Sequence, residues 1–170
     1  DDHVGFAFGW QNRGQMYLFG WKQAFQGTTL PGMAVLKLDT GSSAIDPQRN
    51  DFGNTGSDTA AKTVLAENSI PWQRNINYSF ALSFSGGQFD IGISDGISQL
   101  ASFSITDSAF LDGDFGFFNS SQAGVTYSNL QVSAADRIPV PAGIYLMATG
   151  IAVAASLRWR KKSYSGFVRG

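Results

Sequence analysis

The chain has 170 residues, with 12 Lys or Arg and 13 Asp or Glu, and a formal net charge of −1. The charge is divided unevenly, because residues 1–137 carry seven cations and 13 acids, whereas residues 138–170 carry five cations and no acid. An acidic domain without clustered cations argues against nucleic acid as a partner, and the absence of cysteine excludes disulfides and thiolate metal sites. The part before the tail is long enough for one domain with a substantial core.

Short apolar runs separated by turn residues recur along the first 133 residues, with little helical periodicity. The clearest alternation is in residues 78–85, and Gly86-Gly87 connects it to the next run with the spacing of a two-residue hairpin. This pattern predicts an all-β, antiparallel jelly-roll sandwich. The polar stretch 41–58 predicts a long loop. The expected strands are 4–8, 16–21, 33–38, 78–85, 89–93, 100–105, 115–118 and 125–132.

The C-terminal part follows a different pattern. After a short linker at 134–138, an uncharged run extends to Leu157, and its prolines restrict the helix to about 142–157. That length is at the short end of the range for a membrane-spanning helix. The cations that follow predict that the tail stays in the cytoplasm and that the preceding domain is outside. These cations are Arg158, Arg160, Lys161 and Lys162.

A proline-bearing motif, a short apolar helix and a basic tail, in this order, resemble the C-terminal sorting signals of bacterial exosortases. The motif residues are Pro139, Val140, Pro141, Ala142 and Gly143, similar to the VPLPA variant. The resemblance implies an inner-membrane intermediate, cleavage near the prolines by an exosortase-type enzyme, and release to the cell surface or extracellular matrix. An uncut single-pass anchor is the alternative. The chain begins without a leader pattern, so an export signal is expected upstream.

The globular part carries a second resemblance. Residues 1–11, with the acidic pair Asp1-Asp2 and the Gly-Phe-x-Phe-Gly-aromatic-Gln core, are followed by Trp21-Lys22-Gln23. These motifs and others downstream resemble the C-terminal domain of thrombospondins, an L-type-lectin-like jelly roll, over nearly all of 1–132. The resemblance implies a calcium-dependent adhesive role. The chain is expected to start inside this domain, without its opening strands, and Val132-Ser133 stands where the family has a cysteine.

The sequence gives little support for catalysis. The only histidine is His3, and a hydrolytic triad needs a base that titrates near neutral pH. A sandwich glycosidase needs two paired carboxylates, but Glu67 is the only glutamate and has no acid near it in the sequence. We therefore expect a protein that is not an enzyme.

Calcium is the expected ligand among metals. Asp1 and Asp2 match the acidic run of the thrombospondin domain, and adjacent carboxylates suit Ca²⁺. Asp112 and Asp114 form a second candidate, although Asp-Gly at a strand connection is also typical of a simple turn. With one histidine and no cysteine, zinc is not expected.

Trp10 is the aromatic residue expected to stack on a ligand, because it lies at a strand end, whereas Trp21 continues a core face. Together these features favour an exported, non-enzymatic protein that binds an extracellular glycan or a surface protein. Two alternatives are a carbohydrate-binding appendage of an upstream hydrolase and a permanently anchored adhesin whose acidic face binds a protein.

Overall fold

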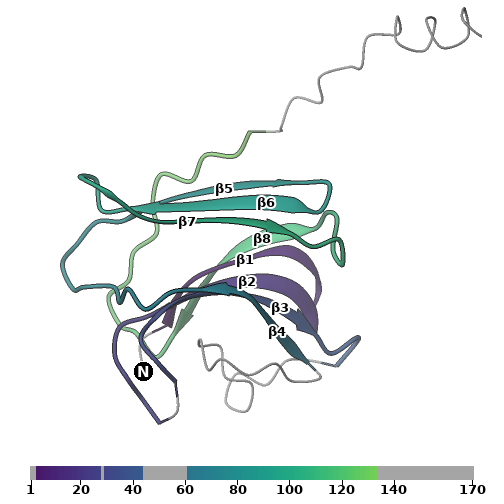
Figure 1. Cartoon of the computed structure of the whole chain (residues 1–170), viewed down its shortest axis with the longest axis horizontal. Coiled ribbons are helices and arrows are strands. Elements are labelled where there is room, and N and C mark those ends of the chain that lie inside the picture. The colour runs from purple at the N-terminus through teal and green to yellow at the C-terminus, as the bar shows by residue number, and fades with distance from the viewer. Residues whose placement is uncertain (1–2, 28, 44–60, 134–170) are drawn as a thin grey trace, which may run out of the picture. The chain divides into compact units, whose positions relative to one another are not determined.

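The computed structural model describes residues 3–27, 29–43 and 61–133, nearly all within the first of two compact units, the one that ends at Val132. Eight β-strands form two antiparallel sheets there, confirming the expected all-β sandwich (Figure 1). None of the described residues belongs to a helix that is long and apolar enough to cross a membrane. The strands are β1 (His3–Asn12), β2 (Gln15–Lys22), β3 (Gly32–Asp39), β4 (Lys62–Glu67), β5 (Ser79–Ser85), β6 (Gln88–Ser94), β7 (Gln99–Thr106) and β8 (Asp114–Ser120).

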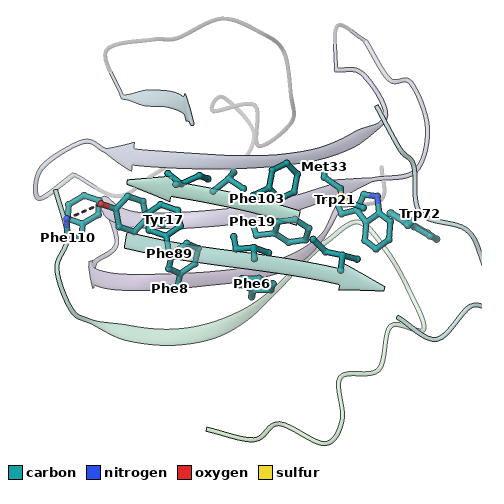
Figure 2. Close-up of a cluster of buried hydrophobic side chains, with 14 residues drawn as sticks. Phe6, Phe8, Tyr17, Phe19, Trp21, Met33, Trp72, Phe89, Phe103 and Phe110 are labelled. Carbon is teal, nitrogen blue, oxygen red and sulfur yellow. Dashed lines mark hydrogen bonds between the residues drawn. The ribbon is translucent and has the colours of Figure 1, made fainter. Parts of the chain in front are cut away.

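The larger sheet has the order β4-β3-β2-β1-β8, and the smaller sheet has the order β5-β6-β7. Alternate side chains of both sheets point into the space between them, as Figure 2 shows. Their burial removes apolar surface from water and so stabilises the sandwich. Phe19 and Trp21 of β2 and Phe89 and Ile91 of β6 are fully buried there. The period-two pattern of the sequence thus marks the inner faces correctly.

Ring contacts show which strands face each other across the core. Phe6 of β1 lies 5.8 Å from Phe80 of β5, and Phe19 of β2 lies 6.5 Å from Phe103 of β7, measured between ring centroids. At the far side β7 also contacts β4. The three-stranded sheet therefore covers β1, β2 and β3, and no described strand lies opposite β8.

The outer face of the five-stranded sheet is also apolar. Met16 and Leu18 of β2 and Leu36 and Leu38 of β3 are each 6% exposed or less. Burial on both faces removes the alternation from a strand, because inward and outward side chains are then both apolar. This explains the nearly continuous apolar run at 33–38.

The strand expected at 125–132 is wrong, because these residues form no strand. Tyr127 within them makes side-chain contacts instead. The Gly5 N–H donates to the Tyr127 hydroxyl over 3.1 Å, and this hydroxyl donates to the Phe118 carbonyl over 2.6 Å. Tyr127 thus bridges β1 and β8 at the point where Gly5 and Phe118 are paired in register.

One strand, β4, has no matching expectation from the sequence. Its three consecutive apolar residues, Val64, Leu65 and Ala66, are all half-buried, so no alternation marks it. Its pairing with β3 also shifts register between Val35 and Leu36. Such an edge strand is defined by its partner rather than by its own pattern.

The C-terminal expectations lie outside the described residues. They comprise the linker at 134–138, the sorting motif at 139–143, the helix at about 142–157 and the basic tail. Most of the loop expected at 41–58 also lies outside them. These stay predictions.

Candidate functional site

The connection between β7 and β8 is fixed to the five-stranded sheet by Asp107. Its Oδ2 lies 2.8 Å from the Lys37 Nζ of β3, in an ion pair with both side chains mostly buried. Its Oδ1 accepts a hydrogen bond from the Tyr17 hydroxyl of β2 over 2.6 Å and another from the Ala109 N–H over 2.9 Å. One carboxylate therefore holds the start of this connection to two strands.

These contacts shift two pKa values in opposite directions. Burial, followed by the hydrogen bond to Asp107, raises the pKa of Tyr17 to about 12. Desolvation acts to raise the pKa of Asp107, but hydrogen bonds from Lys37, Tyr17 and the Ala109 N–H together hold it below its ordinary value. Asp107 is therefore ionised at neutral pH, and its charge stabilises the fold through the ion pair with Lys37.

Phe110 anchors the middle of the connection. Its side chain is 5% exposed, and its ring centroid lies 5.1 Å from that of Tyr17. Its backbone N–H donates to the Tyr17 hydroxyl over 3.2 Å, the bond drawn in Figure 2. The Tyr17 hydroxyl thus donates to one residue of the connection and accepts from another.

Gly113 anchors the end of the connection to β1. Its φ is 134°, and a Cβ added there would lie 2.6 Å from the Gly9 carbonyl carbon and 2.7 Å from the Trp10 nitrogen and oxygen. Only glycine allows this approach of two backbones. Beside it, the Gln11 Nε2 donates to the Asp112 carbonyl over 2.6 Å. Asp112 and Asp114, on either side of Gly113, are therefore held against the end of β1.

The result is a polar and aromatic surface at one end of the sandwich, which we call the β1–β8 patch: Trp10, Gln11, Asp112 and Asp114. Trp10 is paired with Asp114 in the β1–β8 ladder, so their side chains are neighbours on one face. The Trp10 side chain is 37% exposed, and both aspartates are exposed. Two predictions made separately from the sequence, the stacking tryptophan and the second aspartate pair, thus concern one place.

The patch offers Ca²⁺ an incomplete set of ligands. Calcium takes six to eight oxygen ligands, and no three His, Cys, Asp or Glu residues come together among the residues that the structure describes. The carboxylates of Asp112 and Asp114 could supply two of these ligands, while the Asp112 carbonyl already accepts from Gln11.

The first candidate pair, Asp1 and Asp2, lies outside the described residues. The next residue, His3, is paired with Lys22 of β2, whose ammonium group is buried and donates to the Gln26 Oε1 over 3.1 Å. Calcium binding by Asp1 and Asp2 stays a prediction.

The structure places the one histidine and the one glutamate of the sequence on different strands. His3 is at the start of β1, whereas Glu67 is at the end of β4, with β2 and β3 between these strands in the sheet.

Sequence reasoning did not single out Lys37, Asp107 or Tyr17 as a cluster. Lys37 and Asp107 are 70 positions apart, and Tyr17 and Asp107 are 90 apart. No local motif joins residues at such separations. The one available signal was the position of Lys37 within an otherwise apolar strand.

The domain belongs to a defined class. The family model described as Thrombospondin C-terminal region matches residues 1–136, which is most of the chain. The chain therefore belongs to this family, and the resemblance drawn from its motifs is confirmed.

Among curated proteins, the chain is 28% identical over 153 residues to Thrombospondin-3b of Danio rerio, a match covering 82% of the chain and 16% of that protein. Thrombospondin-4 of Bos taurus is 26% identical over 153 residues, with the same coverage. Cartilage oligomeric matrix protein of Rattus norvegicus is 26% identical over 154 residues, covering 82% of the chain and 20% of that protein. The chain thus spans a fifth or less of these relatives.

Proposed function

We propose that this chain is a non-enzymatic, exported bacterial protein of the cell surface or extracellular matrix, in which an L-lectin-like jelly roll mediates adhesion by binding a glycan with Ca²⁺. Its membership in the thrombospondin C-terminal family supports this role. One relative is also named as a matrix protein. The acidic ectodomain and basic tail agree with export and anchoring.

The β1–β8 patch is the observation that carries the proposal. An exposed indole such as Trp10 can stack on the apolar face of a sugar ring at little entropic cost. The carboxylates of Asp112 and Asp114 and the amide of Gln11 can bind hydroxyl groups beside it. When bound, Ca²⁺ would add a hard cation held by the two carboxylates, with water or sugar oxygens as the remaining ligands.

Binding of the soluble extracellular polysaccharide of the native host, measured by calorimetry, tests the patch. We expect Trp10→Ala to weaken the apparent affinity about tenfold, because it removes the stacking surface. Phe25→Ala is the matched control, since Phe25 is 64% exposed on the connection between β2 and β3, away from the patch. Normal binding by Trp10→Ala would overturn the role of the patch.

The role of calcium needs its own arm of the experiment. We expect a chelator to weaken polysaccharide binding by the wild type but not by the Asp112→Asn, Asp114→Asn double variant, which has already lost the ligands. If chelator leaves the wild type unaffected, calcium has no part in binding, whatever the effect of Trp10→Ala.

Delivery by an exosortase-type enzyme is the second part of the proposal, and it rests on the order of motif, apolar run and basic tail. The intact mass of surface-released protein from the native host tests it, with a C-terminus between Pro139 and Gly143 as the expected result. Substituting both Pro139 and Pro141 by Ala should block the cleavage, whereas Pro71→Ala should not. A C-terminus at Gly170 in released protein would contradict sorting and indicate a permanent anchor.

A further inference from the structure

The end of the sandwich where β1 begins carries exposed apolar side chains on three connections. The β2–β3 connection at 23–31, the β4–β5 connection at 68–78 and the β6–β7 turn at 95–98 all lie at this end, on the left of Figure 1. Single exposed apolar residues are normal, but a group of them at one end indicates an interaction surface. We call this group the apolar tips: Phe25, Leu30, Ile70, Ile76 and Ile97.

The same three connections carry almost no charge. They contain one cation, Arg74, and one acid, Asp95, and the connection at 23–31 has no ionisable residue. At the opposite end of the sandwich, by contrast, Asp112 and Asp114 are exposed. The two ends of the domain therefore present different chemistry, one apolar and the other acidic.

The β6–β7 turn holds Ile97 outward. The Asp95 Oδ1 accepts hydrogen bonds from the Ile97 N–H over 2.9 Å and from the Ser98 N–H over 2.8 Å, and the Asp95 N–H donates to the Ser98 carbonyl over 3.2 Å. The Ile97 side chain is 93% exposed. Turns favour Gly, Asn, Asp and Ser for reasons that do not apply to isoleucine. Folding of the turn therefore does not explain why an isoleucine stands there.

The tips of the β2–β3 connection also lie on a fixed backbone. Gln26 and Thr29 form an antiparallel bridge, and each donates its N–H to the carbonyl of the other, over 3.1 and 2.9 Å. Phe25 and Leu30 are the next residues on either side, so they lie opposite each other across this small hairpin. Binding through them does not first have to order the backbone, which lowers its entropic cost.

The β4–β5 connection is held to the sandwich at two points. The Ile70 carbonyl accepts a hydrogen bond from the Trp21 Nε1 over 2.7 Å, and the Gln73 N–H donates to the Tyr78 hydroxyl over 2.8 Å. The Tyr78 ring in turn packs against Trp21, with 4.6 Å between ring centroids. Ile70 and Ile76 nevertheless stay exposed. All three connections thus present apolar side chains from anchored backbones.

We propose that the apolar tips enter the surface of a bilayer of zwitterionic lipids, so that the domain docks on the membrane by this end. The tips come from connections of both sheets, which pack about 10 Å apart, so a flat apolar surface is suited to contact them all. Glu67 at the end of β4 and the pair Asp1-Asp2 before β1 disfavour an anionic surface.

The chain itself supplies the membrane, and the inference rests on the membrane-anchored intermediate of the proposed function. The uncharged run at 138–157 is the predicted membrane segment, and the stretch 134–141 between its helix and the domain spans at most about 25–30 Å. A bilayer tethered this closely has a high effective concentration, so insertion of a few side chains suffices for docking.

Docking by this end also orients the β1–β8 patch. The apolar tips lie where β1 begins at His3, whereas Trp10 and Asp114 lie near the other end of this strand. A domain docked by its tips therefore presents the patch on the side away from the bilayer, where an extracellular glycan is accessible.

Fluorescence quenching in vesicles tests the proposal on the 170-residue chain. The chain contains no cysteine, so an introduced one carries a fluorophore at a single position. In phosphatidylcholine vesicles that contain a lipid with a nitroxide on its acyl chain, we expect about threefold quenching at Phe25→Cys and at Ile97→Cys, because interfacial apolar groups lie about 5–10 Å deep. Leu111→Cys, an exposed site at the opposite end, is the matched control and should stay bright. Equal quenching at Ile97→Cys and Leu111→Cys would overturn the proposal.

Further results separate docking from anchoring and from a protein partner. A chain that does not float with the vesicles overturns both anchoring and docking, whereas a chain that floats with unquenched tips overturns docking alone. Emission that shifts to the blue without quenching by the lipid would indicate a protein or a second copy at the tips and would also overturn docking.

Removing neighbouring tips gives the last test. With the fluorophore at Phe25→Cys, the double substitution Ile76→Ser and Ile97→Ser should abolish the quenching, because the remaining tips no longer hold the domain on the bilayer. Leu111→Ser removes an exposed apolar side chain from the opposite end and should leave the quenching unchanged. Full quenching after the double substitution would contradict docking by the apolar tips.

Discussion

Asp107 and Asp112 lie five positions apart on one connection but have different roles. Asp107 is mostly buried and is bonded to Lys37, Tyr17 and the Ala109 N–H. Asp112 is exposed, and it is its backbone carbonyl that bonds to the sheet. The first carboxylate is used by the fold, while the second is available to a ligand. The partners of a side chain, rather than its type, therefore decide which aspartate can have a binding role.

The largest loss of stability is expected when the buried ring of Phe110, in the middle of this connection, is removed. Phe110→Ala should lower the free energy of unfolding by about 3–5 kcal/mol, because it leaves a cavity beside Tyr17. Leu111→Ala, at a side chain that is 56% exposed, is the control and should change it by about 0.5 kcal/mol. Urea unfolding of both variants measures the difference, and equal losses would mean that Phe110 is not an anchor.

The end of this connection depends on the close approach of Gly113 to β1. Gly113→Ala should cost about 1–3 kcal/mol in backbone strain, with a similar additional cost from the clash with β1. Gly116→Ala is the control, because a Cβ there meets open space. Thermal melting gives the stability loss, and polysaccharide binding shows whether Asp112 and Asp114 have moved from Trp10. A Gly113→Ala protein as stable as Gly116→Ala would contradict the close approach.

Replacing the carboxylates one at a time compares the two aspartates directly. Asp107→Asn should cost about 1–3 kcal/mol, because Lys37 loses its charged partner in a mostly buried setting. Asp112→Asn should leave stability within about 0.5 kcal/mol of the wild type. Chemical unfolding at neutral pH is the measurement. A larger loss for Asp112→Asn than for Asp107→Asn would reverse the assignment of roles.

The smallest effect is a dependence on pH. The pKa of Asp107 is lower in the folded protein than in the unfolded chain, so the ionised carboxylate stabilises the fold above the ordinary pKa of about 3.9. This contribution is lost as the pH falls through the lower folded pKa. The gap in melting temperature between the wild type and Asp107→Asn should therefore narrow below about pH 4. A gap that stays constant to lower pH would show that the charge of Asp107 is not involved.

Seven of the eight strands expected from the sequence are present in the structure, because their apolar spacing is a local property of the chain. The segment 125–132 has similar residues, yet it forms no strand, and the hydroxyl of its Tyr127 bonds to Gly5 of β1 and Phe118 of β8 instead. β4 is the opposite case: its sequence shows no alternation, yet pairing with β3 makes it a strand. Both cases depend on contacts across the sheet, which sequence spacing does not encode.

The sequence indicated the individual residues of the candidate site, but it did not indicate that they lie close together. Trp10 and the pair Asp112 and Asp114 each had a local signal, a strand end for the tryptophan and an Asp-Gly turn for the aspartates. That they lie together follows from the ladder between Trp10 and Asp114 and from the fit of Gly113 against β1. The only signal of the ion pair between Asp107 and Lys37 is the position of Lys37 within an apolar run, which does not identify its partner.

The sequence by itself determined the all-β class, the membership in the thrombospondin C-terminal family and the sharp change of composition at the tail, because these depend on residue type and spacing. Only the tertiary structure decided that Asp107 supports the fold while Asp112 and Asp114 share a surface with Trp10. These features depend on which residues a ladder or a packed core brings within a few ångströms, and such contacts join positions far apart in the chain.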